Sequence, residues 1–271
     1  FLLASFLSVR SLTDMGSSNA FFTFISKKPR EKIFYLYYGL WLACQFLIPF
    51  VIIILLPSTW LTEVWKGDNV TLIVAAFAAS FMQHTVWNFI AQLGESQRLT
   101  QRVQLLNISI AFSHFIIVAI FLSLGHKSII SLYGFVIIEL LLALCFISLT
   151  WPEKLQFKSS SERLLMGQFF KEFKRYCWPL LPYAWVSFAY GFADAWLLQH
   201  FSGSVQQAFY SVGAQIAAIS LVATSSILRI LWKEIAEAQH QGEAEKIKRL
   251  YFNSCQWLFF FAAMVSGFLA P

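Results

Sequence analysis

Ionisable side chains occur at several positions inside long apolar stretches of this 271-residue chain. Inside a membrane, each central charge costs roughly 2.5–3.5 kcal/mol if it faces lipid. We therefore expect these side chains to face a protein interior, where they can pair, bind a ligand or relay protons. They are Arg10, Asp14, His84, His114, Glu139, Asp194, His200 and Arg229.

Arg10 and Asp14 have the most informative spacing. Four residues apart on one helix, they lie on the same face and can pair with each other. Two interpretations stay open: the charges neutralise each other at a helix–helix contact, or Arg10 binds an anionic substrate in a cavity while Asp14 holds it in place. Downstream, Gly16 and Ala20 would permit close helix packing, and Asn19 adds a group able to hydrogen-bond between helices.

Glu139 stands alone among apolar residues in the segment GFVIIELLLALCF. A carboxyl group in the middle of a span should be protonated, paired or engaged in ion coupling. Two roles are open for His84 and for His114: a partner or proton relay for Glu139, or a hydrogen-bonded core residue. Asp194 could likewise be a coupling residue or a hydrogen-bonded core residue.

The sequence contains no recognisable pattern of catalytic or metal-binding residues. The four cysteines follow no CxxC or Cys/His spacing, and GxGxxG, P-loop, HExxH and GxSxG motifs are lacking. The longest connection on the expected outer side, residues 57–69, is too short for extracytoplasmic chemistry. It is expected to be an interfacial turn with Trp60 and Trp65 at the headgroup level. We predict no catalytic residue, no metal and no cofactor, and a protein that is not an enzyme.

Composition indicates the class of protein. Hydrophobic residues make up 58% of the chain and charged residues 13%, about half the charged fraction of a soluble domain. Several apolar stretches are long enough to cross a bilayer, and each should be a helix because backbone groups in lipid need internal hydrogen bonds. The predicted fold class is an all-α polytopic membrane protein. The stretches cover residues 1–26, 33–56, 70–94, 103–124, 128–150, 177–200 and 206–232, with an eighth from about 250.

Lysine and arginine are distributed asymmetrically among the connections. Sixteen of the twenty fall in four connections, which alternate along the chain with connections that hold only Lys66 and Lys127. By the positive-inside rule, the basic connections are cytoplasmic. The net charge of +6 then reflects topology, and no nucleic-acid partner is expected. The basic connections are residues 27–32, 95–102, 152–176 and 233–249.

The connection at 151–176 separates a first group of helices, residues 1–150, from a second group, residues 177–271. Within it, Leu165, Phe169 and Phe173 repeat every four residues while the basic residues take other faces. The pattern predicts a short basic amphipathic helix in the cytoplasmic headgroup layer. A solvated linker with a chance apolar stripe stays open as the alternative.

The segment 169–217 resembles the start of the second half of a flippase of the polysaccharide-transporter family. Shared features are Tyr-x-x-Pro-Leu, an Asp followed by Leu-Leu, a glycine turn and a Tyr-Ser pair. The segment SLTDMGSSNAFFTFIS resembles the second helix of that family, and residues 231–251 resemble its later polar loop. The matching residues in 169–217 are Tyr176, Pro179, Leu180, Asp194, Leu197, Leu198, Gly203, Tyr210 and Ser211.

This resemblance implies the multidrug/oligosaccharidyl-lipid/polysaccharide (MOP) exporter superfamily, in which two lobes of six helices surround a central cavity. The chain is then expected to be a fragment, with helices 2–6 in residues 1–150 and helices 7, 8 and part of 9 in residues 177–271. The implied function is alternating-access flipping of a lipid-linked oligosaccharide, such as an undecaprenyl-pyrophosphate-linked O-antigen or capsule unit, to the outer leaflet of the bacterial inner membrane.

The resemblance and the intramembrane charges together suggest roles for individual residues. An anionic headgroup needs cationic and hydrogen-bonding groups, so Arg10, Asp14, Asn19 and Arg229 are the predicted substrate-binding residues. Predicted ion- or proton-coupling residues are Glu139, Asp194, His84 and His114. Implied partners are the lipid-linked substrate, membrane lipids, and a polysaccharide polymerase and chain-length regulator. The alternatives are a multidrug or cation antiporter of the same superfamily and, less favoured, a membrane-embedded glycan polymerase or ligase.

Overall fold

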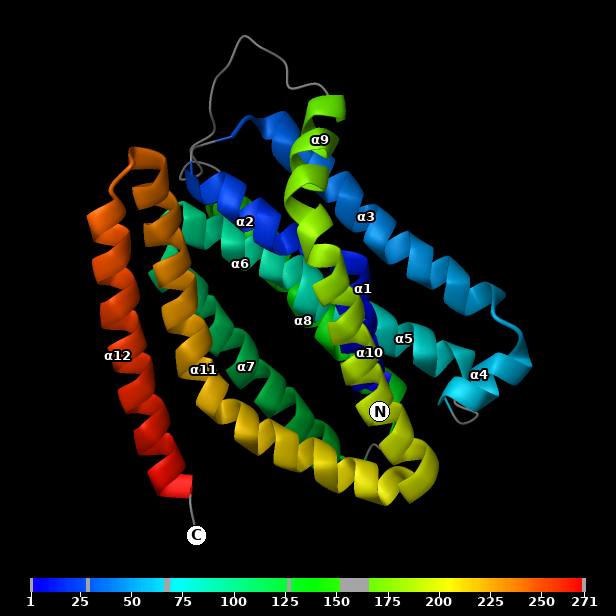
Figure 1. The fold of residues 1–271 in the computed structure, drawn as a ribbon. Helices are drawn as coiled ribbons and strands as arrows, with labels where there is room; N and C mark the ends of the chain where they lie inside the picture. Colours follow the sequence, from blue (N-terminus) through cyan, green and yellow to red (C-terminus); the bar gives the residue numbers. More distant parts are fainter. Residues whose placement is uncertain (1, 28–29, 66–68, 126–127, 152–165, 270–271) are drawn as a thin grey trace.

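A computed structural model describes residues 2–27, 30–65, 69–125, 128–151 and 166–269. Within these ranges every regular element is helical (Figure 1). Four helical runs of the described chain are long and apolar enough to cross a membrane. The prediction of an all-helical protein is confirmed at this level, and these four runs fit a membrane helical bundle. They are α3 (Lys32–Leu55), the run Val70–Ser96, α7 (Thr100–Ser123) and α8 (Ile129–Thr150).

The first apolar stretch is two helices, so the expectation of one continuous helix over residues 1–26 is wrong. α1 (Leu2–Asp14) and α2 (Ser17–Lys27) are separated by Met15 and Gly16, whose φ angles are 49° and 79°. Two successive residues in the left-handed region cannot continue a right-handed helix. Gly16 is therefore part of the break and does not lie inside one continuous helix; the close approach predicted at Gly16 is made by Leu180.

Irregular helical turns interrupt two other stretches. Between α5 (Val70–Phe81) and α6 (Trp87–Ser96), the chain forms a π-helical turn, η1 (Met82–Val86). A second π-helical turn, η3 (Leu198–Ser202), precedes α11. Such turns occur frequently at functional sites. The remaining elements are α4 (Ser58–Trp65), α9 (Met166–Cys177), the 3₁₀ turn η2 (Trp178–Leu180), α10 (Leu181–Leu197), α11 (Gly203–Gln241) and α12 (Ala244–Leu269).

The two groups of helices pack together along α1 and α2. α1 contacts α10 of the second group over much of its length, and α2 contacts α9 and α11. Gly191 of α10 lies against Ser8, and Leu180 lies against Gly16, so α1 and α10 run antiparallel in close contact. α12 packs beside α11 at the edge of the bundle (Figure 1).

α9 forms at the predicted position, but its apolar stripe packs on protein. Phe169 and Phe173 are buried, with ring centroids 5.4 Å and 6.0 Å from that of Phe34 on α3. Aromatic rings stabilise one another in such clusters, so the stripe is covered by α2 and α3. The linker alternative is wrong for residues 166–177, whereas placement in the headgroup layer stays a prediction; Leu165 lies outside the described residues.

The connection at 57–69 contains helix α4, and its two tryptophans behave differently. Trp60 is 63% exposed, as expected of a headgroup-level residue. Trp65 is buried instead, because its indole packs beside Phe6 and donates a hydrogen bond to Ser5 Oγ at 3.2 Å. The prediction for Trp65 is therefore wrong.

The described parts of the basic connections lie at one end of the bundle, the upper end in Figure 1. Arg30 pairs with Glu172 at 3.4 Å, which joins the first and third of these connections. Lys233 of the fourth connection donates hydrogen bonds to the backbone carbonyls of Glu95 and Ser96 in the second. This arrangement agrees with the predicted alternation of the connections; which side of a membrane they face stays a prediction.

Candidate functional site

Asp14 caps the N-terminus of α2 at the break between the two helices. Its carboxylate accepts hydrogen bonds from the hydroxyls of Ser17 (2.8 Å) and Ser18 (2.7 Å) and from the Ser18 backbone N–H (2.9 Å). A carboxylate at a helix N-terminus satisfies free N–H groups and interacts favourably with the helix dipole. The Asp14 carboxylate therefore stabilises the break between α1 and α2.

Ser17 extends this network to α3. Its Oγ accepts hydrogen bonds from Trp41 Nε1 at 3.0 Å and from Gln45 Nε2 at 3.1 Å, and Gln45 is only 4% exposed. A buried network in which each group has a partner fixes the geometry around it. The break is thus a rigid feature anchored to α3.

Arg10 lies one turn before Asp14, yet the two do not form the predicted ion pair. No ion pair within 4.0 Å and no hydrogen bond joins the Arg10 guanidinium to any other residue in the described part of the chain. Asp14 lines a different cavity from Arg10, and its oxygens accept hydrogen bonds from Ser17 and Ser18. Arg10 is half-buried and keeps a positive charge that no described side chain neutralises by contact.

A small cavity of about 10 Å³ adjoins Arg10. Its polar wall is formed by Thr13, Gln45, Ser80 and Thr85, from α1, α3, α5 and η1. A space of this size holds about one water molecule. Arg10 therefore faces the interior of the first group of helices, and in this conformation its cavity is too small for a sugar or a pyrophosphate.

His84 lies in the π-helical turn η1, and Glu139 pairs with His114 instead. The wider turn also places Thr85 of η1 at the Arg10 cavity. The structure thus places the turn that carries His84 beside the cavity of the predicted substrate residue.

Glu139 of α8 and His114 of α7 form a pair, one of the two arrangements predicted for this histidine. His114 Nδ1 lies 3.4 Å from one Glu139 oxygen, and the Ser113 hydroxyl donates to the other. The Glu139 side chain is 10% exposed and that of His114 is 43% exposed. This cluster connects two helices whose other residues are mostly exposed and apolar.

The remaining predicted residues lie apart from these clusters. Asn19 is exposed on α2 and lines neither cavity, and its role in substrate binding stays a prediction. Asp194 is half-buried on α10. The side chain of Arg229, on α11, lies outside the described residues.

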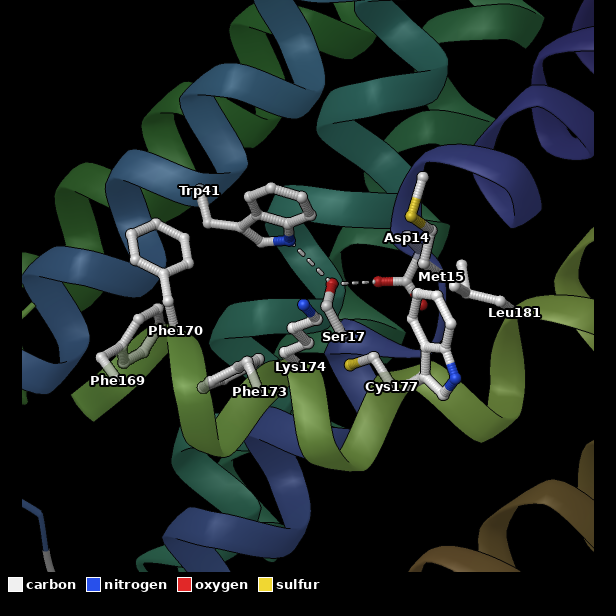
Figure 2. A pocket seen from close by; sticks show the side chains of 11 residues that line it. Asp14, Met15, Ser17, Trp41, Phe169, Phe170, Phe173, Lys174, Cys177 and Leu181 are labelled. Carbon is white, nitrogen blue, oxygen red and sulfur yellow. Dashed lines mark hydrogen bonds between the residues drawn. The ribbon is translucent and has the colours of Figure 1, made fainter. Parts of the chain in front are cut away.

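A second, larger pocket of about 200 Å³ lies beside the break, between the two groups of helices (Figure 2). Its walls are mostly aromatic, from Trp41 of α3, from Phe170 and Phe173 of α9, and from Trp178. Two charged groups line it, Asp14 from α1 and Lys174 from α9. It shares no lining residue with the Arg10 cavity.

Polar contacts join the two groups of helices at the end that carries the basic connections. We call these contacts the seam. Thr23 Oγ1 lies 3.2 Å from the Tyr176 hydroxyl and accepts a hydrogen bond from Trp232 Nε1 at 3.0 Å. Nearby, Lys233 Nζ donates to the carbonyls of Glu95 and Ser96 at 3.2 and 3.3 Å.

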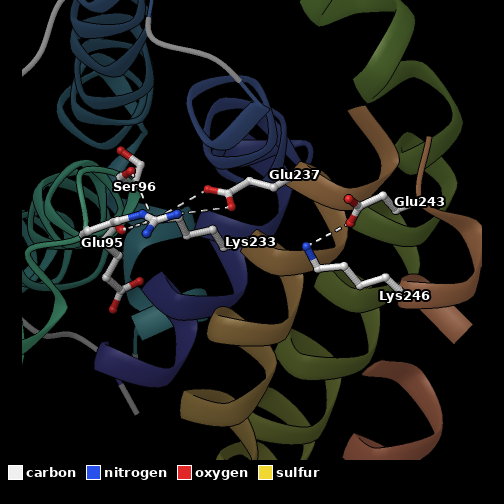
Figure 3. Close-up of polar contacts among 7 residues, drawn as sticks. Glu95, Ser96, Lys233, Glu237, Glu243 and Lys246 are labelled. Atoms are coloured by element: carbon white, nitrogen blue, oxygen red, sulfur yellow. Dashed lines mark hydrogen bonds and ion pairs between the residues drawn. The ribbon is translucent and has the colours of Figure 1, made fainter. Parts of the chain in front are cut away.

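Charges reinforce the seam (Figure 3). Glu237 lies 3.6 Å from Arg98 and 4.0 Å from Lys233. Burial lowers the pKa of Lys233 from its ordinary value, and Glu237 opposes that shift by favouring the charged form. Farther out, the exposed Lys246 pairs with Glu243 at 2.9 Å, which raises the pKa of Lys246.

Sequence reasoning missed the break, the aromatic pocket and the seam. The order Asp14, Gly16, Ser17 carried a local signal for the break, since glycine ends helices and aspartate caps them. Thr23, Lys174 and Trp232 carried no such signal, because their partners lie far away in sequence. Among the described residues, no group of three or more histidine, cysteine or acidic side chains is placed to hold a metal ion.

Comparison with protein-family models, with curated proteins and with solved structures finds no match for this chain.

Proposed function

We propose that the chain belongs to a transporter of the bacterial inner membrane that flips a lipid-linked oligosaccharide to the outer leaflet. In this proposal the protein is a flippase of the MOP type, and its basic connections face the cytoplasm. Its substrate carries a negatively charged headgroup, such as a pyrophosphate, and a hydrocarbon chain that stays in the bilayer. Its partners are that substrate and the proteins that assemble the polysaccharide.

The observation that carries this proposal is the positive charge on Arg10. A half-buried guanidinium in an apolar bundle, without an ion pair or hydrogen bond to any described side chain, costs free energy that packing alone does not recover. An anionic ligand would supply the missing partner. Arg10 also precedes a break in a helix, and interrupted helices commonly form the substrate sites of secondary transporters.

Binding a headgroup at Arg10 requires the helices around it to separate, because the present cavity holds about one water molecule. The seam closes one end of the interface between the two groups of helices. We therefore assign this conformation to a state closed at the end with the basic connections. Rocking one group against the other would open that end and widen the Arg10 cavity.

Coupling to an ion gradient is assigned to the Glu139–His114 pair. Both groups titrate, they lie within 3.4 Å of each other, and a proton taken up by either changes the charge of the pair. His84 is assigned to the Arg10 site, because it lies in the turn η1 that lines the Arg10 cavity. Asp194 stays a second candidate for coupling.

The test is transport by the purified protein, in its complete natural length, in proteoliposomes. A fluorescent lipid-linked oligosaccharide is placed in both leaflets, and its movement is followed by chemical quenching of the outer leaflet. Losing a charge-assisted hydrogen bond costs about 1.5–3 kcal/mol, so Arg10→Ala should slow transport roughly ten- to a hundredfold. Arg10→Lys should restore part of the rate.

Arg102→Ala is the matched control, because Arg102 is exposed at the start of α7 and lines neither cavity. All variants must insert at the wild-type level. An unchanged rate for Arg10→Ala would remove Arg10 from the site, and the absence of transport by the wild-type protein would refute the flippase proposal itself.

A multidrug or cation antiporter is the second candidate, and the aromatic pocket favours it. Aromatic faces beside a carboxylate attract organic cations, and Asp14 supplies that carboxylate. Two features oppose it: the Asp14 oxygens already accept three hydrogen bonds, and the Lys174 ammonium shares the pocket. Uptake of a fluorescent organic cation by the same proteoliposomes, lost in Asp14→Asn, would favour the antiporter.

A further inference from the structure

We propose that the aromatic pocket beside the helix break binds one acyl chain of an anionic glycerophospholipid of the bilayer, with its phosphate at Lys174. This site is separate from the Arg10 cavity, and the inference does not depend on the proposed transport activity.

The pocket has an almost wholly apolar lining, and its two charged lining residues are Lys174 and Asp14. Lys174 lies on α9, and its ammonium is on the pocket side in Figure 2. Its Nζ also lies 5.9 Å from the ring centroid of Trp178, in the geometry of a cation–π contact. Apolar side chains such as Phe170, Phe173 and Leu181 form most of the wall, and Asp14 lies beside Met15 at the break. A cation above an apolar groove matches a phosphate above a hydrocarbon chain.

The pocket is also accessible from outside the bundle. Phe170 and Trp178 on its rim are 44% and 65% exposed. Exposed tryptophan and lysine side chains are characteristic of the membrane–water interface, where a long lysine side chain keeps its ammonium at the headgroups. α9 belongs to the end with the basic connections, because its Glu172 pairs with Arg30. A bilayer lipid can therefore reach this pocket from the leaflet.

The charge at the pocket favours an anionic headgroup over a zwitterionic one. Lys171 and Arg175 are exposed on the same helix and add to the positive field of Lys174. Basic residues next to a membrane attract anionic lipids by about 1 kcal/mol each. Asp14 works against an anion, but its carboxylate accepts three hydrogen bonds at the N-terminus of α2, which offsets its charge.

The size of the pocket argues against the transported substrate. About 200 Å³ is below the 300–1,000 Å³ typical of small-molecule sites. An oligosaccharide with its pyrophosphate does not fit there, whereas a segment of one acyl chain does. The pocket is therefore assigned to a resident lipid that fills the junction of α1, α3 and α9.

The experiment measures protection of Cys177, which lines the pocket, from alkylation. The other three cysteines, Cys44, Cys145 and Cys255, are exposed and are replaced by alanine. The purified protein in detergent is mixed with dioleoyl-phosphatidylglycerol, with dioleoyl-phosphatidylcholine or with undecaprenyl phosphate. Lipid retained by the protein is counted in parallel by native mass spectrometry.

We expect phosphatidylglycerol to slow alkylation of Cys177 and phosphatidylcholine to have little effect. Lys174→Gln should weaken retention of phosphatidylglycerol about fivefold, the equivalent of about 1 kcal/mol. Lys171→Gln is the matched control, since Lys171 is exposed on the same helix and does not line the pocket. It should change retention much less.

Three outcomes would overturn the inference: equal protection by both phospholipids, no effect of Lys174→Gln, or stronger protection by undecaprenyl phosphate than by phosphatidylglycerol. The last would assign the pocket to the lipid carrier of transport. Arg10→Ala separates this inference from the proposed function, because it should slow transport and leave phosphatidylglycerol binding unchanged.

Discussion

At the scale of single residues, the backbone conformation of two residues breaks the first helical segment. Met15 and Gly16 both adopt left-handed φ angles, and only glycine does so without a steric penalty from Cβ. At residue 16 there is a second constraint, because an added Cβ would lie 2.7 Å from Leu180 Cδ1. Gly16 thus sets both the break and the approach of α1 to the start of α10.

Gly16→Ala should lower the stability of the protein by about 2 kcal/mol, because alanine resists this φ value and meets Leu180. Gly39→Ala is the matched control. Gly39 lies within α3 with a normal helical backbone, and nothing lies within 4 Å of an added Cβ. Thermal unfolding in detergent should show a lower midpoint for Gly16→Ala alone. Equal midpoints for the two variants would contradict the assigned role of Gly16.

At the scale of elements, two helices at the edge of the first group depend on a polar cluster. α7 and α8 bury few of their residues, and their apolar side chains gain little by leaving lipid for one another. The contacts of Glu139 with Ser113 and His114 are therefore a specific link between these helices. The pair Glu139–His114 is also the proposed coupling site. The same residues would therefore hold the two helices together and couple transport to an ion gradient.

A double-mutant cycle of Glu139→Ala and His114→Ala should give a coupling energy of about 0.6–1.7 kcal/mol, the range measured for polar contacts between membrane helices. The unfolding free energy in bicelles is the measurement. Combining Glu139→Ala with His240→Ala provides the control, since His240 is exposed on α11 and should show no coupling. If the first cycle also gives no coupling, the pair does not link α7 and α8.

At the scale of the whole molecule, the seam holds the two groups of helices together at one end. Thr23 contacts both Tyr176 of α9 and Trp232 of α11, so one residue of α2 joins the connecting helix and the second group. Lys233 adds hydrogen bonds to two backbone carbonyls at the end of α6. Alternating access would have to break these contacts once in each cycle.

Linking Thr23→Cys to Trp232→Cys with a short, reducible bifunctional thiol reagent should therefore stop transport, and reduction should restore it. The native cysteines are replaced by alanine for this experiment, and each single-cysteine variant treated with the reagent is a control. Lipid flipping in proteoliposomes is the measurement. Full transport by the cross-linked protein would show that the seam does not open during the cycle.

The sequence by itself determined the class of the protein and the positions of the ionisable residues within its apolar stretches. Apolar stretches of bilayer length must become helices, because backbone groups in lipid have no other hydrogen-bond partners. The alternation of basic connections also followed from the sequence, because each membrane-crossing helix reverses the side. The structure places the described parts of those connections at one end, through contacts such as Arg30–Glu172 and Lys233–Glu95.

Only the tertiary structure decided which charged residues meet. Spacing allowed Arg10 to pair with Asp14, but two serines in the following turn take the Asp14 oxygens once the chain breaks. Glu139 had two possible histidine partners in the sequence, and the packing of α7 on α8 selects His114. The pocket at Lys174 arises from helices far apart in the chain. Helix periodicity describes one segment at a time, whereas these contacts depend on how separate segments pack together.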